Sequence, residues 1–467
     1  MRTGSVPWGA QELKSPRKAA ACLRPVAWCI VLALLAHGSG STAGSLASAS
    51  RILVIAPHPD DETLGAGGLI YTSCLRGAQV KVVFMTMGDG SGAAAGILFG
   101  TGRPSPDHMI ALGHRRHGEA VAALAALGVT GEDVVFLGYP DGGLADIIDN
   151  RHWRLNEPYA SKHTGCHYSP YASSLTPGAE YCASRIVSDL AMMFANYMPD
   201  LVLVPHPLDT HSDHWATYAL AMYAIEQLNY VEVTGARVLA YIVHADANWP
   251  NPWGYRPDLP LDPPQWRGTP QATWIHAALT EEAIAAKLRA LEQYESQLVG
   301  ISAFLKSFVR SNELFSSVPV IDLASHNESG PRHGDDALST RADPRPFRVL
   351  PPSGEIRSVV ADRVEDGIAV TATLAWRPSP SVTYRLQMVS PVPTAALSER
   401  QCEKPHQPVK ELTYETTPSS GWRRPWEVAF LIPLHDLESL GAKALIEVVT
   451  LRRGAVADRS GWILLRM

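Results

Sequence analysis

Short apolar runs alternate with longer amphipathic stretches over the first two thirds of the chain. Runs of four to eight residues predict buried strands, and apolar residues that recur every three or four positions predict helices. Their alternation is typical of an α/β fold with a mostly parallel sheet covered by helices. The expected strands are 52–56, 80–87, 134–137, 201–204 and 238–243, and the expected helices are 63–76, 111–127, 186–196, 215–228, 280–294 and a further stretch to about 315.

The last part of the chain has a different pattern, in which polar and apolar residues alternate within short runs. Short strands with turns between them predict a small all-β sandwich. The runs are 370–375, 384–389, 426–432, 444–451 and 462–465. Before them, a stretch rich in Ser, Asn, Gly, Asp, Arg and Pro is typical of a linker. We therefore expect an α/β domain at 51–320, a linker at 321–345 and a β-sandwich domain at 346–467.

The chain opens with a basic stretch, the apolar residues 26–36 and a series of small residues up to Ala43. This order is typical of a secretory signal peptide. Its apolar core has 11 residues, fewer than the ~20 that a membrane-spanning helix needs. We therefore expect a signal peptide at 1–43 and an exported protein, periplasmic or extracellular, without a spanning segment in the mature chain. A signal anchor that is not cleaved is the alternative.

Net charge and cysteine content indicate which partners to expect and whether the cysteines are oxidised. The formal net charge is −6, and the first 43 residues carry +4, which leaves −10 for the rest. An acidic body without a Lys/Arg run argues against nucleic acid as a partner. Cys166 and Cys182 flank one polar segment, so an oxidising compartment predicts a disulfide between them, worth roughly 3 kcal/mol. Cys74 fits a buried free thiol within the first expected helix, and Cys402 has no assigned role.

Ionisable side chains crowd the end of the first expected strand, in the stretch Pro57-His58-Pro59-Asp60-Asp61-Glu62. The two prolines force an extended exit from the sheet, and ligands bind at the carboxyl ends of strands in open α/β sheets. A polar loop with a helix-capping Asp would explain one carboxylate. Two adjacent Asp residues near a His are better explained by a bound cation, which neutralises the carboxylates and takes the imidazole as a nitrogen donor.

The same order of features recurs after the expected strand 201–204, where the stretch His211-Ser212-Asp213-His214 precedes a helix. Right-handed crossovers bring the exits of parallel strands to one edge of the sheet. We therefore expect His58 and Asp61 to meet His214 in space. Two His and one Asp are the ligand set of a catalytic zinc site, which keeps one position open for water.

This set predicts metal-assisted hydrolysis of an amide or ester. Zn²⁺ is the expected ion, although the same donors would hold another divalent metal. Asp60 then stays free as a general base. His211, held as an imidazolium by Asp213, would stabilise an oxyanion or protonate a leaving amine. Each histidine alone is explained equally well as a loop or core residue, so the hypothesis depends on the whole set.

The two stretches resemble the signature blocks of the PIG-L/LmbE-type zinc de-N-acetylases, a family of N-acetylglucosaminyl deacetylases. Lesser similarities follow in the same order, in blocks 116–120, 137–144, 287–297 and 312–315. The resemblance implies a Rossmann-like fold and hydrolysis of an N-acetyl group, typically on an N-acetylglucosamine unit. Residues 150–180 and 346–467 fall outside it.

The resemblance also implies roles for individual residues. It makes His58, Asp61 and His214 the metal ligands, Asp60 the general base, His211 the electrostatic partner oriented by Asp213, and Arg116 and Asp141 the substrate contacts. Asp141 stands among glycines, so a turn-forming Asp-Gly explains it equally well by itself. Asp209 occupies a position where some members carry a Tyr that polarises the carbonyl, and that role is not carried over.

The expected signal peptide would place the protein outside the cytosol, where soluble cytosolic precursors are not available as substrates. We therefore predict deacetylation of an extracytoplasmic N-acetylhexosamine glycan, such as an exopolysaccharide. Aromatic residues suited to a sugar-stacking rim are Trp153, Trp249, Trp253, Tyr255 and Trp266. Two alternatives stay open: a non-catalytic glycan-binding or scaffold protein that works through its β domain, and a zinc amidase or esterase that acts on a non-sugar substrate.

Overall fold

The computed structural model describes residues 46, 48–150, 152–153, 156–245, 248–264, 274–323, 338–339, 354–390, 410–417 and 426–467. The chain divides into two compact units, 1–48 and 49–467, and the fold described below is that of the second unit. The expected signal peptide, Cys402 and Trp266 lie outside the described residues. The expected domain boundaries stay predictions.

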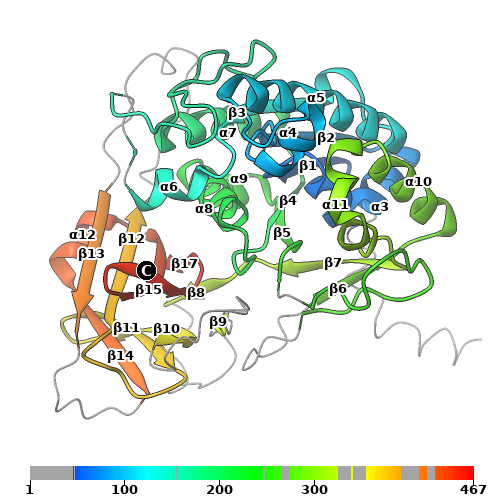
Figure 1. The fold of residues 1–467 in the computed structure, drawn as a ribbon. Coiled ribbons are helices and arrows are strands. Elements are labelled where there is room, and N and C mark those ends of the chain that lie inside the picture. The colour runs from blue at the N-terminus through cyan, green and yellow to red at the C-terminus, as the bar shows by residue number, and fades with distance from the viewer. Residues whose placement is uncertain are drawn as a thin grey trace, which may run out of the picture. The chain divides into compact units, whose positions relative to one another are not determined.

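A seven-stranded sheet forms the centre of the α/β part, with strands in the order β3-β2-β1-β4-β5-β7-β6 (Figure 1). The parallel strands are β1 (Arg51–Ala56), β2 (Gln79–Thr86), β3 (Val134–Tyr139), β4 (Leu201–Pro205) and β5 (Arg237–Tyr241). Two further strands, β6 (Trp274–Ala278) and β7 (Asn312–Ser317), extend the sheet through antiparallel pairing. The expected α/β fold with a mostly parallel sheet is confirmed. The strand order changes direction between β1 and β4, and ligands bind at such a switch point.

Helices cover both faces of this sheet. One packed group is α3 (Asp61–Leu75), α5 (Pro106–Leu127) and α10 (Glu281–Leu291), and the other is α6 (Leu144–Asp149), α7 (Ala183–Tyr197) and α8 (Ser212–Gln227). The remaining helices are α4 (Gly92–Phe99), the 3₁₀ turn η1 (Gly131–Asp133), α9 (Tyr230–Thr234) and α11 (Glu295–Lys306). Helix α3 lies directly on β5, because a Cβ at Gly65 would fall 2.3 Å from the ring of Tyr241. The close approach fixes the start of α3, where the first ionisable cluster lies.

The segment 312–317 corrects the prediction of a helix that continues to about residue 315. It forms β7, because β6 pairs with it along its whole length. The carboxylate of Glu313 also accepts hydrogen bonds from the backbone N–H groups of Gly68 (2.7 Å) and Leu69 (2.9 Å) in α3. The partner strand β6 lies beyond a Pro- and Trp-rich segment, so the local pattern around residue 315 carries no sign of this pairing.

Two further sheets make up the C-terminal region. One contains β9 (Leu338–Ser339), β10 (Ile356–Val364), β11 (Gly367–Leu374) and β14 (Glu427–Pro433), and the other contains β8 (Val320–Asp322), β12 (Thr383–Ser390), β13 (Lys410–Thr416), β15 (Lys443–Arg452) and β17 (Ile463–Arg466), with β16 (Ala455–Arg459) paired to β15. Residues from both sheets, such as Val370 and Ile446, share one buried core. The expected all-β sandwich is therefore confirmed. Helix α12 (Leu434–Leu440) follows β14.

Cys166 and Cys182 are free cysteines in the structure, so the predicted disulfide is wrong. The reason is local. The Sγ of Cys166 lies 3.8 Å from the carbonyl oxygen of Thr164, and the Sγ of Cys182, at the start of α7, lies 3.5 Å from Ser184 Oγ. Cys74 is also free and half-buried, which agrees with the expected thiol.

Among the described residues, no helix combines the length and the apolar character that crossing a membrane would require.

Candidate functional site

The first ionisable cluster lies on the turn between β1 and α3. Asp60 adopts a φ of 118°, which is rare for a residue with a side chain and costs of order 1–3 kcal/mol. Several contacts hold this turn: the N–H of Asp60 donates to Glu62 Oε2 (3.1 Å), and the side-chain amide of Gln297 donates to the carbonyl of Pro59. Strained backbone of this kind concentrates at functional sites.

Glu62 is the structural anchor of this turn. Its buried carboxylate accepts hydrogen bonds from the Tyr294 hydroxyl (2.6 Å) and from the hydroxyl of Thr63. Burial raises the pKa of Glu62 to about 7. Asp60 contrasts with it, because none of the described residues donates a hydrogen bond to the Asp60 carboxylate, although the side chain is buried. Of the three acids on the turn, Asp60 is therefore the one left free for chemistry.

The second cluster is organised by Asp209, which the sequence analysis left without a role. Its Oδ2 accepts hydrogen bonds from the N–H groups of Val243 (3.0 Å) and His244 (2.9 Å) and lies 3.0 Å from His214 Nδ1. Its Oδ1 accepts from the N–H of His211 (2.9 Å). A carboxylate of this kind behind a histidine fixes which ring nitrogen carries the proton. Here Nδ1 of His214 is the donor, and Nε2 points toward the first cluster.

The two clusters meet at Asp61. Its Oδ2 lies 3.1 Å from His58 Nδ1 and 3.2 Å from His214 Nε2. The ring centroids of His58 and His214 are 5.4 Å apart, and those of His58 and His211 are 4.7 Å apart. Residues from two turns about 150 positions apart are thus brought together, as expected from the parallel sheet.

Among the residues that the structure describes, three overlapping groups of side chains could hold a metal ion, each with three donor atoms within 4.8 Å of one another. They are His58, His211 and His214; Asp61, His214 and His244; and His58, Asp141 and Asp213. The His214 Nε2 atom is buried and makes no hydrogen bond with any described residue, although it faces a carboxylate oxygen at 3.2 Å. Because two lone pairs repel each other, a cation or a proton belongs between them. The mixed nitrogen and oxygen donors fit a divalent ion such as Zn²⁺.

Burial and neighbouring charges shift the pKa values of these groups. Burial alone would raise the pKa of Asp61, but His214 and His58 hold it well below its usual range. Burial alone would lower the pKa of His214, but Asp209 and Asp61 raise it to about 10. The pKa of Asp60 is raised well above its usual range by burial and by the neighbouring charge of Asp61.

Asp213 differs from its expected role of orienting His211. Its carboxylate accepts hydrogen bonds from the N–H groups of Gly142 (2.6 Å) and Leu144 (3.1 Å) at the start of α6, and it lies 3.2 Å from His58 Nε2. Only the backbone of Asp213 contacts His211, through an N–H donated to Nδ1 at 3.3 Å. The reason is tertiary, because α6 brings two free N–H groups within reach of this carboxylate.

His211 differs from its expected state as well. Burial, together with the nearby His58 and His214, lowers the pKa of His211 to about 4, so the ring is neutral at pH 7 rather than an imidazolium. Since Nδ1 accepts the Asp213 N–H, the proton of the neutral ring is on Nε2.

Arg116 and Asp141 lie on either side of the glycine-rich loop 88–90 beside the site. Arg116, on α5, donates from Nη1 to the carbonyl of Gly88 (2.7 Å). Asp141 accepts from the N–H of Gly90 (2.6 Å) and lies 3.3 Å from His58 Nε2. A Cβ would fall 2.8 Å from the Arg116 side chain at Gly88 and 2.6 Å from Asp141 at Gly90. The glycines let both side chains approach the site.

His244 is a further residue of the site that the sequence analysis did not assign. It follows β5, and its ring centroid lies 4.9 Å from that of His214 and 5.4 Å from that of His211. Its ring also stacks on Phe304 at 5.6 Å. The available signal was its position after a third parallel strand, at the edge where the other two clusters lie.

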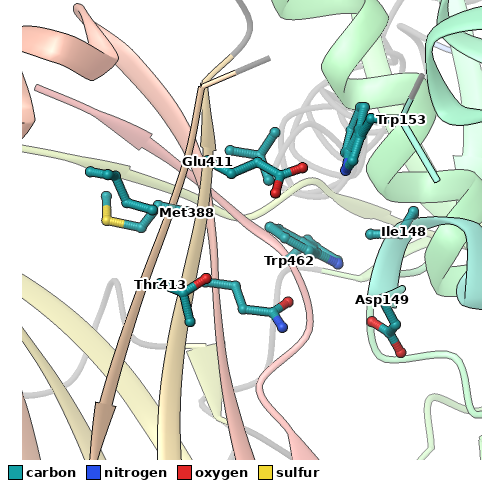
Figure 2. A pocket seen from close by; sticks show the side chains of 10 residues that line it. Ile148, Asp149, Trp153, Met388, Glu411, Thr413 and Trp462 are labelled. Atoms are coloured by element: carbon teal, nitrogen blue, oxygen red, sulfur yellow. The ribbon is translucent and has the colours of Figure 1, made fainter. Parts of the chain in front are cut away.

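The expected aromatic rim is only partly found. Trp253 is 51% exposed and contacts Phe304 edge to face at 5.8 Å, which links it through His244 to the site. Tyr255 is exposed, and Trp249 is buried with its Nε1 donating to Asp262. Trp153 lines a different hollow, which none of the candidate site residues lines (Figure 2).

Comparison with known proteins gives relatives for this part of the chain. A 1D-myo-inositol 2-acetamido-2-deoxy-alpha-D-glucopyranoside deacetylase of Mycobacterium sp. (strain KMS) is 42% identical over 205 residues, which cover 43% of this chain and 57% of that protein. The protein of the same name from Mycolicibacterium gilvum (strain PYR-GCK) is 28% identical over 299 residues, 60% of this chain and 93% of that protein. The chain thus spans somewhat more than half the length of the first relative.

Solved structures and family models complete the comparison. The N,N'-diacetylchitobiose deacetylase from Pyrococcus horikoshii is similar with 18% identity and a TM-score of 0.36, over 63% of this chain and 93% of that one. Residues 53–225 match the family model PIG-L, described as GlcNAc-PI de-N-acetylase. These residues contain the β1–α3 turn, the glycine-rich loop and the start of α8. The family resemblance read from the two sequence blocks is therefore confirmed for residues 53–225.

Proposed function

We propose that this protein is a metal-dependent deacetylase that hydrolyses the N-acetyl group of an N-acetylglucosamine-type sugar. One observation carries the proposal: His58, Asp61 and His214 converge from two distant turns, with the unengaged carboxylate of Asp60 next to them. The names of the mycobacterial relatives describe removal of the acetyl group from a 2-acetamido-2-deoxyglucose unit, which supports this substrate class.

His58, Asp61 and His214 would hold the metal ion. When bound, a divalent ion supplies Lewis acidity that favours ionisation of water and polarises a carbonyl group. Asp209 holds the Nδ1 proton of His214, so that Nε2 is available as a ligand.

Asp60 carries the proton transfers in this proposal, and His211 stabilises the charge that develops on the carbonyl oxygen. Asp60 takes the proton of the attacking water, because its carboxylate accepts no hydrogen bond from the described residues and lies next to Asp61. His211 is a neutral donor, since Asp213 N–H occupies its Nδ1 and the proton lies on Nε2. That N–H would stabilise the oxyanion as the water adds. Asp60, which then carries the proton of the water, would give it to the amine as the C–N bond breaks.

Arg116 and Asp141 would bind the sugar hydroxyl groups, because both line the glycine-rich loop beside the site. Trp253 offers an exposed aromatic face for stacking on a second sugar unit. The basic and apolar N-terminal stretch supports export as part of the proposal, and with it an extracytoplasmic glycan as substrate.

Acetate release tests the proposal. The purified protein is incubated with N-acetylglucosamine oligomers and with acetylated non-sugar amides and esters, with chelator, and with chelator followed by Zn²⁺. We expect acetate from the sugars, its loss with chelator and its return with Zn²⁺. No metal-dependent acetate from any sugar would refute the proposal, and release only from the non-sugar compounds would favour an amidase or esterase.

A variant separates catalysis from binding. Asp60→Asn removes the proposed base and leaves the three ligands in place, so turnover is expected to vanish while metal binding persists. Unchanged function in this variant would favour the alternative of a glycan-binding or scaffold protein.

A further inference from the structure

The C-terminal region packs directly against the helices that carry the site. Trp462, Leu464, Val389 and Leu445 of this region belong to the same buried core as residues of α6, α7 and α8. Figure 2 shows the side chain of Trp462 beside Ile148 and Asp149 of α6, at a small hollow that all three residues line. The family match ends at residue 225, so the C-terminal side of this contact lies outside the matched residues.

Ionic contacts from the C-terminal region hold both ends of α8. At its C-terminal end, Lys443 Nζ lies 2.7 Å from Glu226 Oε2. At its N-terminal end, the guanidinium of Arg459 lies 4.4 Å over the ring of Trp215, the residue directly after His214. Arg459 is itself fixed by ion pairs to Glu447 (2.8 Å) and to Asp149.

The Arg459 ion pair reaches α6 as well. Asp149 is the last residue of α6, and Asp213 accepts hydrogen bonds from the N–H groups of Gly142, just before that helix, and Leu144, its first residue. One side chain of the C-terminal region, Arg459, thus contacts two of the helices whose N-terminal ends border the site, α6 and α8.

Gly461 lies close against the turn between β4 and α8. It has a φ of +71°, and a Cβ there would fall 2.9 Å from the carbonyl oxygen of Pro207 and 3.1 Å from Leu208 Cδ2. These are the two residues before Asp209, whose carboxylate holds His214 Nδ1 at 3.0 Å. Any displacement of Pro207 and Leu208 therefore moves the group that orients His214.

We propose that the segment Arg459–Trp462 of the C-terminal region positions the turn 206–211, and that Gly461 is a positioning residue for the metal ligand His214. The inference rests on the proposed function for the role of His214. The turn 206–211 contains Pro207 and the buried ionisable residues His206 and Asp209, and it forms no regular element. The packing beneath it therefore decides where Asp209 lies. The C-terminal region then contributes to catalysis without a residue that touches the substrate.

Gly461→Ala tests the inference, with Gly454→Ala as its matched control. Gly454 lies in the same region with a similar φ of +77°, but no atom lies within 4 Å of the position of an added Cβ. Both variants carry the same backbone strain, and only Gly461→Ala presses on Pro207. The full-length proteins are compared by melting temperature, by Zn²⁺ affinity in competition with a chromophoric chelator, by kcat and KM for acetate release, and by hydrogen exchange of the backbone N–H groups of 206–215.

We expect a lower melting temperature for Gly461→Ala than for Gly454→Ala, because only at Gly461 does the added Cβ fall 2.9 Å from a backbone carbonyl oxygen. Gly461→Ala alone should bind Zn²⁺ about 10-fold more weakly, the scale of effect known for groups that orient a metal ligand. It should also lower kcat more than it changes KM, and raise hydrogen exchange in 206–215. Equal Zn²⁺ affinity, kinetics and exchange in both variants would overturn the inference.

Failure of the proposed function gives a different result. If the wild type releases no acetate, the proposed function fails, while Zn²⁺ affinity and exchange in 206–215 still decide whether Gly461 positions the turn. If Gly461→Ala does not fold, Arg459→Lys replaces it, because lysine keeps the charge for Glu447 and Asp149 but loses the planar stacking on Trp215. Weaker Zn²⁺ binding in that folded variant supports the inference, and unchanged binding and exchange overturn it.

Discussion

Asp209→Asn is the most direct test of how the site is built. The buried carboxylate accepts four hydrogen bonds: three on Oδ2, from His214 Nδ1 and the N–H groups of Val243 and His244, and one on Oδ1, from the N–H of His211. Asparagine has the same size but only one oxygen and no charge. Its oxygen at the Oδ2 position keeps three of the contacts, and its NH₂ group then faces the His211 N–H as a second donor.

The magnitude follows from these contacts. Charge-assisted hydrogen bonds are roughly twice as strong as neutral ones, so the bond to His214 weakens although it persists. Changes to a group that orients a metal ligand typically cost 10–100-fold in affinity. Because three of four contacts survive, we expect the lower end, about 10-fold, which corresponds to about 1.4 kcal/mol. The unpaired N–H of His211 should lower the free energy of unfolding by about 1–3 kcal/mol.

Two measurements check this prediction. Zn²⁺ affinity is determined at pH 7 by competition with a chromophoric chelator, and the free energy of unfolding of the metal-free protein is determined with urea. Asp200→Asn is the control, because Asp200 also accepts several hydrogen bonds, from Ser50 and the N–H of Arg51, but at the opposite end of β4. The control should lose stability and keep its Zn²⁺ affinity. Unchanged Zn²⁺ affinity in folded Asp209→Asn would refute the role given to Asp209.

Three further predictions concern the base and two buried charges. Asp60→Asn should lower kcat at least about 100-fold, as expected for loss of a general base. Its Zn²⁺ affinity should stay unchanged. A kcat near that of the wild type would contradict the role of Asp60 as the base. Lys287→Met should lower the free energy of unfolding, measured with urea, by about 3–5 kcal/mol. The reason is that Lys287 Nζ lies 2.7 Å from the buried Glu313 Oε1, which would lose its counter-charge. A loss below about 1 kcal/mol would contradict this reasoning. Burial raises the pKa of Glu447 to about 7, so the folded state binds more protons than the unfolded state, and the stability from this group falls as the pH rises from about 4.5 to 7. Glu447→Gln should lack this fall when free energies of unfolding are compared across that range, and parallel pH profiles of the two proteins would contradict it.

The sequence was sufficient wherever neighbours in the chain decide the structure. The five parallel strands follow from apolar runs that are buried on both faces of the sheet. The spacing of His58 and Asp61 places both on one turn, and the distance of 3.1 Å between them is a local property of that turn. The meeting with His214 was also predictable, because crossover handedness brings parallel strand exits to one edge.

Contacts between distant segments could not be predicted from the sequence. The strand β7 depends on its partner β6, and the helical pattern around Phe315 gives no sign of that pairing. The expected link between Asp213 and His211 came from their spacing, whereas the start of α6 takes the Asp213 carboxylate instead.

The sequence by itself thus determined most of the elements and the chemistry of the site: which parallel strands form, which turns carry ionisable groups, and which donors make up the proposed ligand set. The tertiary structure decided how those groups are held. Asp209 orients His214, and Gly461 lies beneath the same turn from the far end of the chain. The physical reason is that hydrogen bonds and steric contacts act over a few ångströms, so residues far apart in sequence interact only once the fold has set their positions.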